Sequence, residues 1–277
     1  MNVSVLRSSS PLWLNIDAMK QIHPTAIIED GAELHESVTV GPFSIIESDV
    51  IIGEGCVIDS SVRIFRGTSL GRNNRVCSGA MLGCEPQDLT FDPANSKPLV
   101  IGENNHIKEG VNISRGVKTK EGTLIGNGNY FMCGFHAGHD CRFGNNNIFG
   151  PNSTIAGHVG IGDKVFVSGL VGIHQFTFIG DHAMIGGCSK VVKDVPPYAT
   201  CDGNPARLVG LNAIGLKRSG FDPKKRAAIK QAYKTLFLSG LNISQALEQL
   251  KGEGLTEEVE KLVRFIEKSD RGVTGHK

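Results

Sequence analysis

A six-residue period governs most of this chain. Every sixth residue is apolar from Ile22 to Leu82, from Ile101 to Ile113 and again from Ile125 to Val191. If that residue is position 1, position 5 is usually small or apolar, whereas positions 3 and 4 are mostly Asn, Asp, Gly, Glu or Pro. Position 5 and the next position 1 are separated by one outward residue, which is typical of a strand. The polar pair at positions 3 and 4 is typical of a turn.

Each hexad therefore predicts one short strand followed by one corner. Three hexads, or 18 residues, close one coil, and coils stack at the usual strand spacing of about 4.8 Å. The predicted architecture is mainly β, a parallel β-helix in which each coil covers only its neighbours. The ends of such a solenoid need caps.

The period divides the chain into three parts. Residues 1–21 precede it and are expected to form an N-terminal extension, 22–198 form the β-helix, and 199–277 form an α-helical C-terminal domain. Inside the β-helix the register breaks near 84–100 and 117–123, which predicts two loops ejected from the coils. Loops on a rigid scaffold often carry function, although tolerated insertions would leave the same pattern.

Composition excludes several classes of protein. Lys and Arg total 29 against 28 for Asp and Glu, so we expect no general nucleic-acid binding. The seven cysteines form no CxxC pair, which argues against a disulfide framework or a structural zinc site and favours a reducing, cytoplasmic location. No apolar run approaches the roughly 18 residues of a membrane span, so we expect no integral membrane segment.

Positive charge is concentrated in the C-terminal part. Residues 205–234 hold eight lysines and arginines against one acid, Asp222. Asp222 followed by proline is typical of a helix start, and Thr256 before two glutamates is typical of another. The basic segment is either a solvated helix face or a surface for an acidic partner or a phosphate-bearing ligand.

The 18-residue register stacks distant residues on one corner of the prism. That corner carries His139, Asp140, Gly157, His158, Gln175 and Phe176. His136 and His174 lie on outward positions beside it. Histidines gathered with a carboxylate and a glycine indicate a functional site rather than an ordinary surface.

The residue types at this corner suit general-base catalysis. An imidazole titrates near neutral pH, so His139 is predicted to be the base. Asp140 would orient the ring and stabilise its cation, and the backbone N–H of Gly157 would stabilise an oxyanion if the strand ladder leaves it free.

Two alternatives remain open. His136, His139, His158 and His174 could bind zinc, as in the similar γ-class carbonic anhydrases, but they are spread over three coils, roughly 10 Å along the axis. Because a catalytic zinc needs ligands converging on one point, we expect no metal. A catalytically silent solenoid acting as an interaction scaffold would need none of these histidines.

Several short segments resemble those of a known family. The segments are Gln87-Asp88-Leu89, His136-Ala-Gly-His139-Asp140-Cys141, Ala156-Gly157-His158-Val159, His174-Gln175-Phe176 and Asp194-Val-Pro-Pro-Tyr198. With the hexads, and with Asn212 and Gly215-Leu-Lys-Arg218, they resemble the acyl-acyl carrier protein–UDP-N-acetylglucosamine O-acyltransferases over about 22–275. The resemblance implies a left-handed β-helix, an exception to the usual right-handed crossover, assembled as a homotrimer with sites between subunits.

The resemblance also implies an activity and its residues. The family transfers a 3-hydroxyacyl chain from acyl carrier protein to a UDP-sugar in the first step of lipid A biosynthesis, with no cofactor beyond the carrier's phosphopantetheine. By resemblance, His139, Asp140 and Gly157 are catalytic, Gly187 sets the acyl length, and the substrate contacts are Gln87, Asp88, His136, His158, His174, Gln175, Asn212 and Arg218. The basic segment 205–234 would dock the acidic carrier.

Four positions depart from the family pattern. Thr90 and Ser219 stand where lysine and arginine are common, Ser114 stands where the family has histidine, and Ile214 replaces a polar residue. These departures affect the expected phosphate and phosphopantetheine contacts. They leave open whether the acceptor is UDP-N-acetylglucosamine or its 3-amino analogue, and a CoA-dependent acetyltransferase is a nearby alternative.

Overall fold

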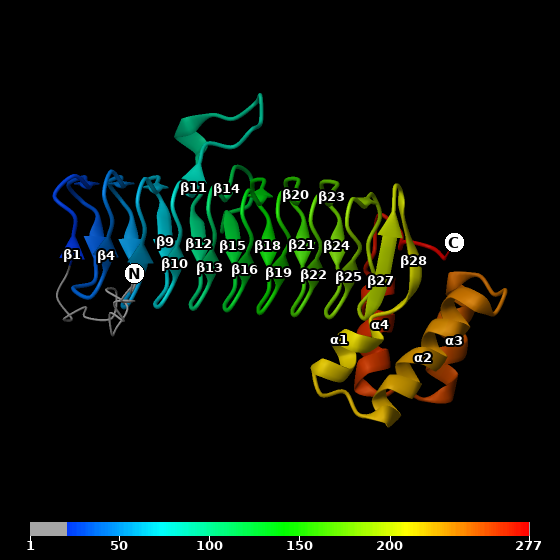
Figure 1. The fold of residues 1–277 in the computed structure, drawn as a ribbon. Helices are drawn as coiled ribbons and strands as arrows, with labels where there is room; N and C mark the ends of the chain where they lie inside the picture. The colour runs from blue at the N-terminus through cyan, green and yellow to red at the C-terminus, as the bar shows by residue number, and fades with distance from the viewer. Residues whose placement is uncertain (1–20, 277) are drawn as a thin grey trace, which may run out of the picture.

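The computed structural model describes residues 21–276, which form a three-sided prism of stacked coils followed by helices (Figure 1). His136 pairs with Thr154, and Thr154 pairs with Gly172, so each coil contains 18 residues as predicted. The parallel β-helix is therefore confirmed. The expected extension 1–21 lies outside the described residues except for Gln21, where the first strand begins.

Three parallel sheets form the faces of the prism. Face 1 has eleven strands, β1(Gln21–Ile22), β4(Thr39–Val40), β7(Val57–Ile58), β10(Arg75–Val76), β13(His106–Ile107), β16(Tyr130–Phe131), β19(Ile148–Phe149), β22(Phe166–Val167), β25(Met184–Ile185), β27(Ala199–Gly203) and β28(Ala206–Leu211). Face 2 has nine, β2(Ile27–Ile28), β5(Ile45–Ile46), β8(Arg63–Ile64), β11(Met81–Cys84), β14(Asn112–Ser114), β17(His136–Ala137), β20(Thr154–Ile155), β23(Gly172–Ile173) and β26(Lys190–Val191). Face 3 has eight, β3(Glu33–Leu34), β6(Ile51–Ile52), β9(Thr68–Leu70), β12(Leu99–Ile101), β15(Thr123–Ile125), β18(Arg142–Phe143), β21(Gly160–Ile161) and β24(Phe178–Ile179).

The core is the column of position-1 side chains inside the prism. Ile46, Ile64 and Ile113 are fully buried, and the rings of Phe131 and Phe149 stack one coil apart with centroids 5.0 Å apart. Burying one such side chain contributes about 1.5–3 kcal/mol, and every coil repeats the contribution. The six-residue period is thus the signature of this column.

The corner between faces 3 and 1 is stabilised by polar side chains, and we call it the asparagine corner (Asn105, Asn127, Asn129, Asn145, Asn147, Asp163 and Asp181). On its outer side, Asn127 Oδ1 accepts a hydrogen bond from Glu103 N at 2.7 Å, and Asp163 Oδ1 accepts one from Asn145 N at 2.6 Å. On its inner side, Asn129 Oδ1 accepts one from Asn147 N at 2.9 Å. Each coil is therefore tied to the next by side chains as well as by the strand ladder.

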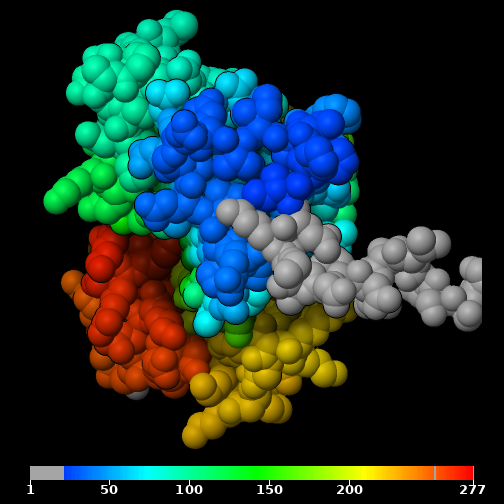
Figure 2. Space-filling view, turned by 90° about the vertical axis from the view of Figure 1, so that its left-hand side faces the viewer, coloured from blue at the N-terminus to red at the C-terminus, as the bar shows by residue number. Residues whose placement is uncertain are grey.

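Two loops leave the coils. The first joins β11 to β12, includes the short helix η1(Pro93–Asn95), and stands out from the prism in both the ribbon and the space-filling view (Figures 1 and 2). The second joins β14 to β15. Lys97 N donates to Gly116 O at 3.0 Å, and Gly116 N donates to Pro98 O at 3.3 Å, so the loops are bonded to each other.

Residues 199–211 differ from the expected helical domain. They form the antiparallel hairpin of β27 and β28, and β27 extends face 1 by pairing with β25. The reason is alternation, because Ala199 and Cys201 are buried whereas Asp202 is exposed. The hairpin covers the last coil, whose strand edge would otherwise be open.

The helices begin only after this hairpin, beside the C-terminal end of the prism (Figure 1). They are α1(Ala213–Arg218), α2(Pro223–Leu238), α3(Ile243–Glu253) and α4(Glu257–Glu267). Asp222 and Thr256 cap α2 and α4 as predicted, accepting hydrogen bonds from Lys225 N and Val259 N. Within the described range 21–276, no helix has the length and apolar character needed to cross a membrane.

Candidate active site

Three successive turns between faces 2 and 3 form what we call the histidine corner (His139, Asp140, Gly157, His158, Gln175 and Phe176). The turns follow β17, β20 and β23. Their second residues have left-handed backbones, with φ of 57° at Asp140, 61° at His158 and 60° at Phe176. This conformation turns the chain sharply, so two consecutive side chains can reach the same side of the corner.

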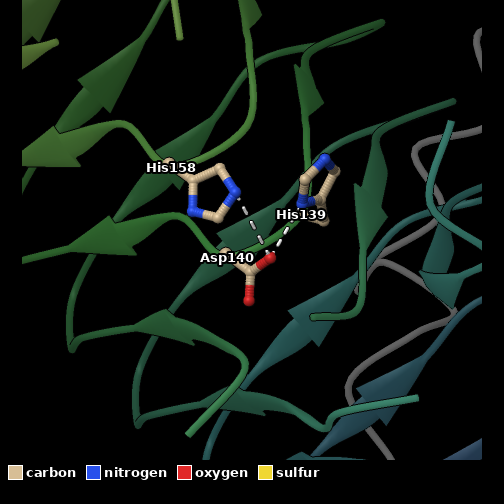
Figure 3. Close-up of side chains that lie close together, drawn as sticks. All are labelled: His139, Asp140 and His158. Atoms are coloured by element: carbon tan, nitrogen blue, oxygen red, sulfur yellow. Dashed lines mark hydrogen bonds and ion pairs between the residues drawn. The ribbon is translucent and has the colours of Figure 1, made fainter. Parts of the chain in front are cut away.

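His139 and Asp140 form a hydrogen-bonded pair (Figure 3). The Nδ1 atom of His139 lies 2.8 Å from Oδ2 of Asp140. Because an ionised carboxylate only accepts hydrogen bonds, Nδ1 carries the proton. The lone pair of the neutral ring is then on Nε2, which is the atom left to take a proton from a substrate.

The Asp140 side chain is fully buried and held by the second loop. It accepts hydrogen bonds from the backbone N–H groups of Val117, Lys118 and Thr119, and from the Thr119 hydroxyl at 2.7 Å. Burial by itself raises the pKa of this carboxyl, but the hydrogen bonds from His139, Thr119 and Lys118 outweigh burial and lower the pKa to about 2. Asp140 is therefore a permanent anion beside the His139 ring.

The first loop brings a second carboxylate to the other side of that ring. Oδ2 of Asp88 lies 4.0 Å from Nε2 of His139. Thr90 donates to Oδ1 of Asp88 through both its N–H and its hydroxyl, each at 2.8 Å, and these bonds lower the pKa of Asp88. Thr90, which departs from the family pattern, thus orients Asp88. Gln87 is exposed beside it and lines an adjoining hollow of about 840 Å³.

Gly157 lies against the His139 ring, close to Nε2. A Cβ atom at this position would approach Nε2 of His139 to 2.9 Å, so a larger residue would displace the ring. The Gly157 N–H has no acceptor among residues 21–276. It is therefore free of the ladder, as its predicted role as an oxyanion donor requires.

His158 packs against the pair from the next coil. Its ring meets His139 edge to face with centroids 5.0 Å apart, and it stacks on Phe176 at 4.6 Å. Its Nε2 atom lies 3.7 Å from Oδ2 of Asp140. Burial lowers the pKa of His158, which keeps its imidazole neutral at physiological pH.

The other predicted contacts on this side of the prism flank the corner. His136 is half-buried, with Nδ1 3.0 Å from Oδ1 of Asn112, and burial lowers its pKa. His174 and Gln175 are exposed, and the guanidinium of Arg271 from the C-terminal tail donates to Gln175 O at 3.0 Å. These groups form a rim around the His139–Asp140 pair.

Three predicted site residues lie elsewhere in the chain. Asn212 caps α1 through Gly215 N and donates from Nδ2 to His182 O at 2.9 Å, which places it beside the asparagine corner. Arg218 is exposed at the end of α1. Gly187 lies on the remaining corner, between faces 1 and 2. A single chain therefore does not bring these three residues to His139.

The donor set fits a hydrogen-bonded base better than a metal centre. Among residues 21–276, the only cluster of three metal-type ligands is His139, Asp140 and His158, with ligand atoms within 4.8 Å of one another. A metal ion on Asp140 would displace donors of the second loop and leave buried N–H groups unpaired, which is costly. His136 and His174, which the zinc hypothesis required, are not in the cluster.

Sequence reasoning did not identify the second-loop residues that hold Asp140. Val117, Lys118 and Thr119 contribute mainly through backbone N–H groups, which leave no signature in side-chain type. The only signal was the break in the hexad register near 117–123.

Two family models match the chain. One, described as Udp N-acetylglucosamine O-acyltransferase, Domain 2, matches residues 194–274, and the other, Bacterial transferase hexapeptide (six repeats), matches 31–66. The first covers the hairpin and the helices, and the second covers part of the β-helix.

Curated relatives are similar over nearly the whole chain. The acyl-[acyl-carrier-protein]–UDP-N-acetylglucosamine O-acyltransferase of Aliivibrio salmonicida is 50% identical over 257 residues, covering 91% of this chain and 97% of its own. The enzyme of the same name from Paraburkholderia phymatum is 46% identical over 262 residues, covering 92% and 99%.

Solved structures are similar over the same share of the chain. LpxA from Acinetobacter baumannii superposes with a TM-score of 0.89 at 40% identity, covering 92% of this chain and 100% of its own. This similarity confirms the predicted left-handed β-helix with a C-terminal helical part. The chain therefore belongs to the acyl-[acyl-carrier-protein]–UDP-N-acetylglucosamine O-acyltransferase family.

Proposed function

We propose that this protein transfers a 3-hydroxyacyl chain from acyl carrier protein to the 3-position of UDP-N-acetylglucosamine, or of its 3-amino analogue, in the first step of lipid A biosynthesis. The observation that carries the proposal is the surroundings of His139. Asp140 occupies Nδ1, while Nε2 lies beside Asp88 and Gly157 with its lone pair available.

In the proposed step, Nε2 of His139 takes the proton of the sugar 3-hydroxyl as its oxygen attacks the thioester carbon. The tetrahedral oxyanion accepts a hydrogen bond from the Gly157 N–H, and the buried Asp140 anion stabilises the imidazolium. Collapse of the intermediate breaks the carbon–sulfur bond, and the leaving thiolate takes the proton back from Nε2. A 3-amino acceptor would use the same base.

This chemistry needs no metal or diffusible cofactor, because the thioester already activates the acyl group. Gln87, Asp88, His136, His158, His174 and Gln175 surround the base and would hold the sugar and the nucleotide. Asn212 and Arg218 would hold the UDP.

The separation of the predicted residues supports assembly as a homotrimer. His139, Gly187 and Asn212 lie at three different corners of one prism, so no single chain can surround one substrate with all three. Three prisms packed side by side would place different corners of neighbouring chains together. We therefore place each active site between subunits.

Carrier docking and acyl length concern regions outside the histidine corner. Exposed lysines of α2, such as Lys230 and Lys234, would attract an acidic carrier protein in the cytoplasm.

At Gly187 a Cβ atom would meet only Gly169 O at 3.6 Å and Ser168 Cβ at 3.9 Å, so the glycine leaves room for a longer acyl chain. Gly187→Met should shift preference to shorter chains.

The decisive experiment is a mass-spectrometric acyl-transfer assay. UDP-N-acetylglucosamine and its 3-amino analogue are offered separately with 3-hydroxyacyl carriers of several lengths, and acetyl-CoA is offered as an alternative donor. We expect acylated UDP-sugar from the carrier only. Transfer from acetyl-CoA alone would indicate the acetyltransferase alternative. No product from the folded protein would refute the proposal and direct attention to bound zinc.

A further inference from the structure

A basic hollow of about 610 Å³ opens beside α1, far along the prism from His139. Its lining residues are Ala213, Ile214, Lys217, Arg218 and Arg226. Three of these five side chains are cations, and none is an acid. Lys217 and Arg218 come from α1, whereas Arg226 reaches the same hollow from α2.

The Nε atom of the Arg226 side chain is buried, and within the described residues 21–276 it has no hydrogen-bond acceptor. Buried N–H groups are normally paired, and leaving a charged donor unpaired is costly. A guanidinium with an unpaired Nε–H, in a hollow whose lining has no acid, indicates an anionic ligand that supplies the missing acceptor.

The position of Arg226 in the first turn of α2 also favours a bound anion. Lys224, Lys225 and Arg226 occupy the first turn, which contains no acid. Cations in the first turn of a helix oppose its dipole, which makes the position unfavourable for them. Lys225 is neutralised by Glu258, whereas Arg226 forms no such pair within the described part of the chain. A bound anion would offset this unfavourable interaction.

We propose that Arg226 binds the diphosphate of the UDP-sugar together with Arg218, and so replaces the arginine that the family commonly has at position 219. Ser219 caps the end of α1, where its N–H donates to Gly215 O at 2.9 Å, and it carries no charge. Arg226 supplies the second guanidinium from the neighbouring helix. Two guanidiniums suit a diphosphate because each can bond phosphate oxygens in pairs.

This inference rests on the proposed function, since that function supplies the diphosphate. The phosphate of phosphopantetheine has the same chemistry and is the other possible source. We assign the diphosphate because Arg218, already expected to hold UDP, lines the same hollow.

The test is calorimetric titration of UDP into the full-length protein, with Arg226→Gln compared with the wild type. We expect UDP affinity to fall about 10- to 100-fold, as is usual when a charge-assisted hydrogen bond is lost. The KM for UDP-sugar should rise by a similar factor, while the KM for acyl carrier protein should stay within about twofold. Arg264→Gln, on α4 and paired with Glu260, is the matched control and should change neither.

A second variant provides a rescue. Adding Ser219→Arg to Arg226→Gln should restore most of the UDP affinity, because it returns a cation to the hollow. Unchanged UDP affinity in a folded Arg226→Gln protein would overturn the inference, and so would a rise in the KM for the carrier alone. Neither result would affect the proposed function, which fails only if the wild type forms no acylated sugar.

Discussion

The asparagine corner and the histidine corner have the same backbone conformation but differ in how their turn N–H groups are hydrogen-bonded. At the asparagine corner, the N–H groups of Asn127, Asn145 and Asp163 each donate to a side chain one coil away, as Asn127 N does to Asn145 Oδ1 at 2.8 Å. At the histidine corner, the N–H groups of His139, Gly157 and Gln175 have no acceptor among residues 21–276. The asparagine corner uses these N–H groups to join neighbouring coils, whereas those of the histidine corner are unpaired within the described residues.

The residue that precedes each turn also differs between the two corners. A Cβ atom at Gly144 would lie 2.2 Å from Oδ1 of Asp163, and one at Gly162 would lie 2.2 Å from Oδ1 of Asp181. Glycine is needed there because the capping side chains fill that space. The equivalent positions of the histidine corner are Gly138, Ala156 and His174, so two of the three carry a side chain there.

The largest effect should come from removing the base at the histidine corner. His139→Ala should lower kcat by about 10²–10⁴-fold, the usual loss for a general base, while a cooperative thermal unfolding transition is retained because the side chain leaves no core cavity. The acyl-transfer assay and thermal unfolding measure the two quantities. Normal turnover in this variant would remove His139 from the mechanism.

Asp140 links the histidine corner to stability as well as to function. Its pKa is lowered from 3.8 to about 2, so the carboxylate contributes about 2 kcal/mol of stability above pH 4, which is lost as pH falls towards 2. Asp140→Asn lacks this contribution. Denaturant unfolding at a series of pH values should therefore show the wild type more stable at neutral pH, with the difference shrinking between about pH 4 and 2. Parallel curves would contradict the assignment.

Disrupting the asparagine corner should affect stability alone. Asp163→Ala removes the acceptor of Asn145 N and of Asn145 Nδ2, at 2.6 and 3.1 Å. We expect a loss of about 1–2 kcal/mol in the free energy of unfolding with kcat unchanged. Reduced kcat in the folded variant would show that the two corners are not separate in function.

A single methyl group at the histidine corner should give the smallest effect. Gly157→Ala would place Cβ 2.9 Å from Nε2 of His139, so the ring must shift by a few tenths of an ångström. We expect kcat to fall about tenfold, since small misplacements of a catalytic group are costly. Gly172→Ala, where a Cβ atom meets nothing within 4 Å, is the control and should retain full activity.

Not all of the interior followed from the period. Position 5 was expected to be small or apolar, yet Asn105, Asn129 and Asn147 are buried there. Asn129 Nδ2 donates to Asn105 Oδ1 across the coils at 3.0 Å, whereas Nδ2 of Asn147 has no partner among residues 21–276. The period identifies inward positions but does not show which polar groups find partners there, because those partners lie one coil away.

The sequence by itself determined the coil and the stack. A strict hexad leaves one arrangement that buries every position-1 side chain, and that arrangement places His139, Asp140 and Gly157 at one corner. The resemblance implies sites between subunits, and the structure adds where the separated residues lie in one chain, with Asn212 bonded to His182 O beside the asparagine corner.

Only the tertiary structure decided how the loops complete the site. Asp88 meets His139, and the second loop encloses Asp140, through contacts that the hexad register does not describe. The hairpin at 199–211 likewise depends on the open end of the last coil that it covers. A period encodes contacts at one fixed spacing, whereas loops and caps are placed by backbone hydrogen bonds that many different sequences can make.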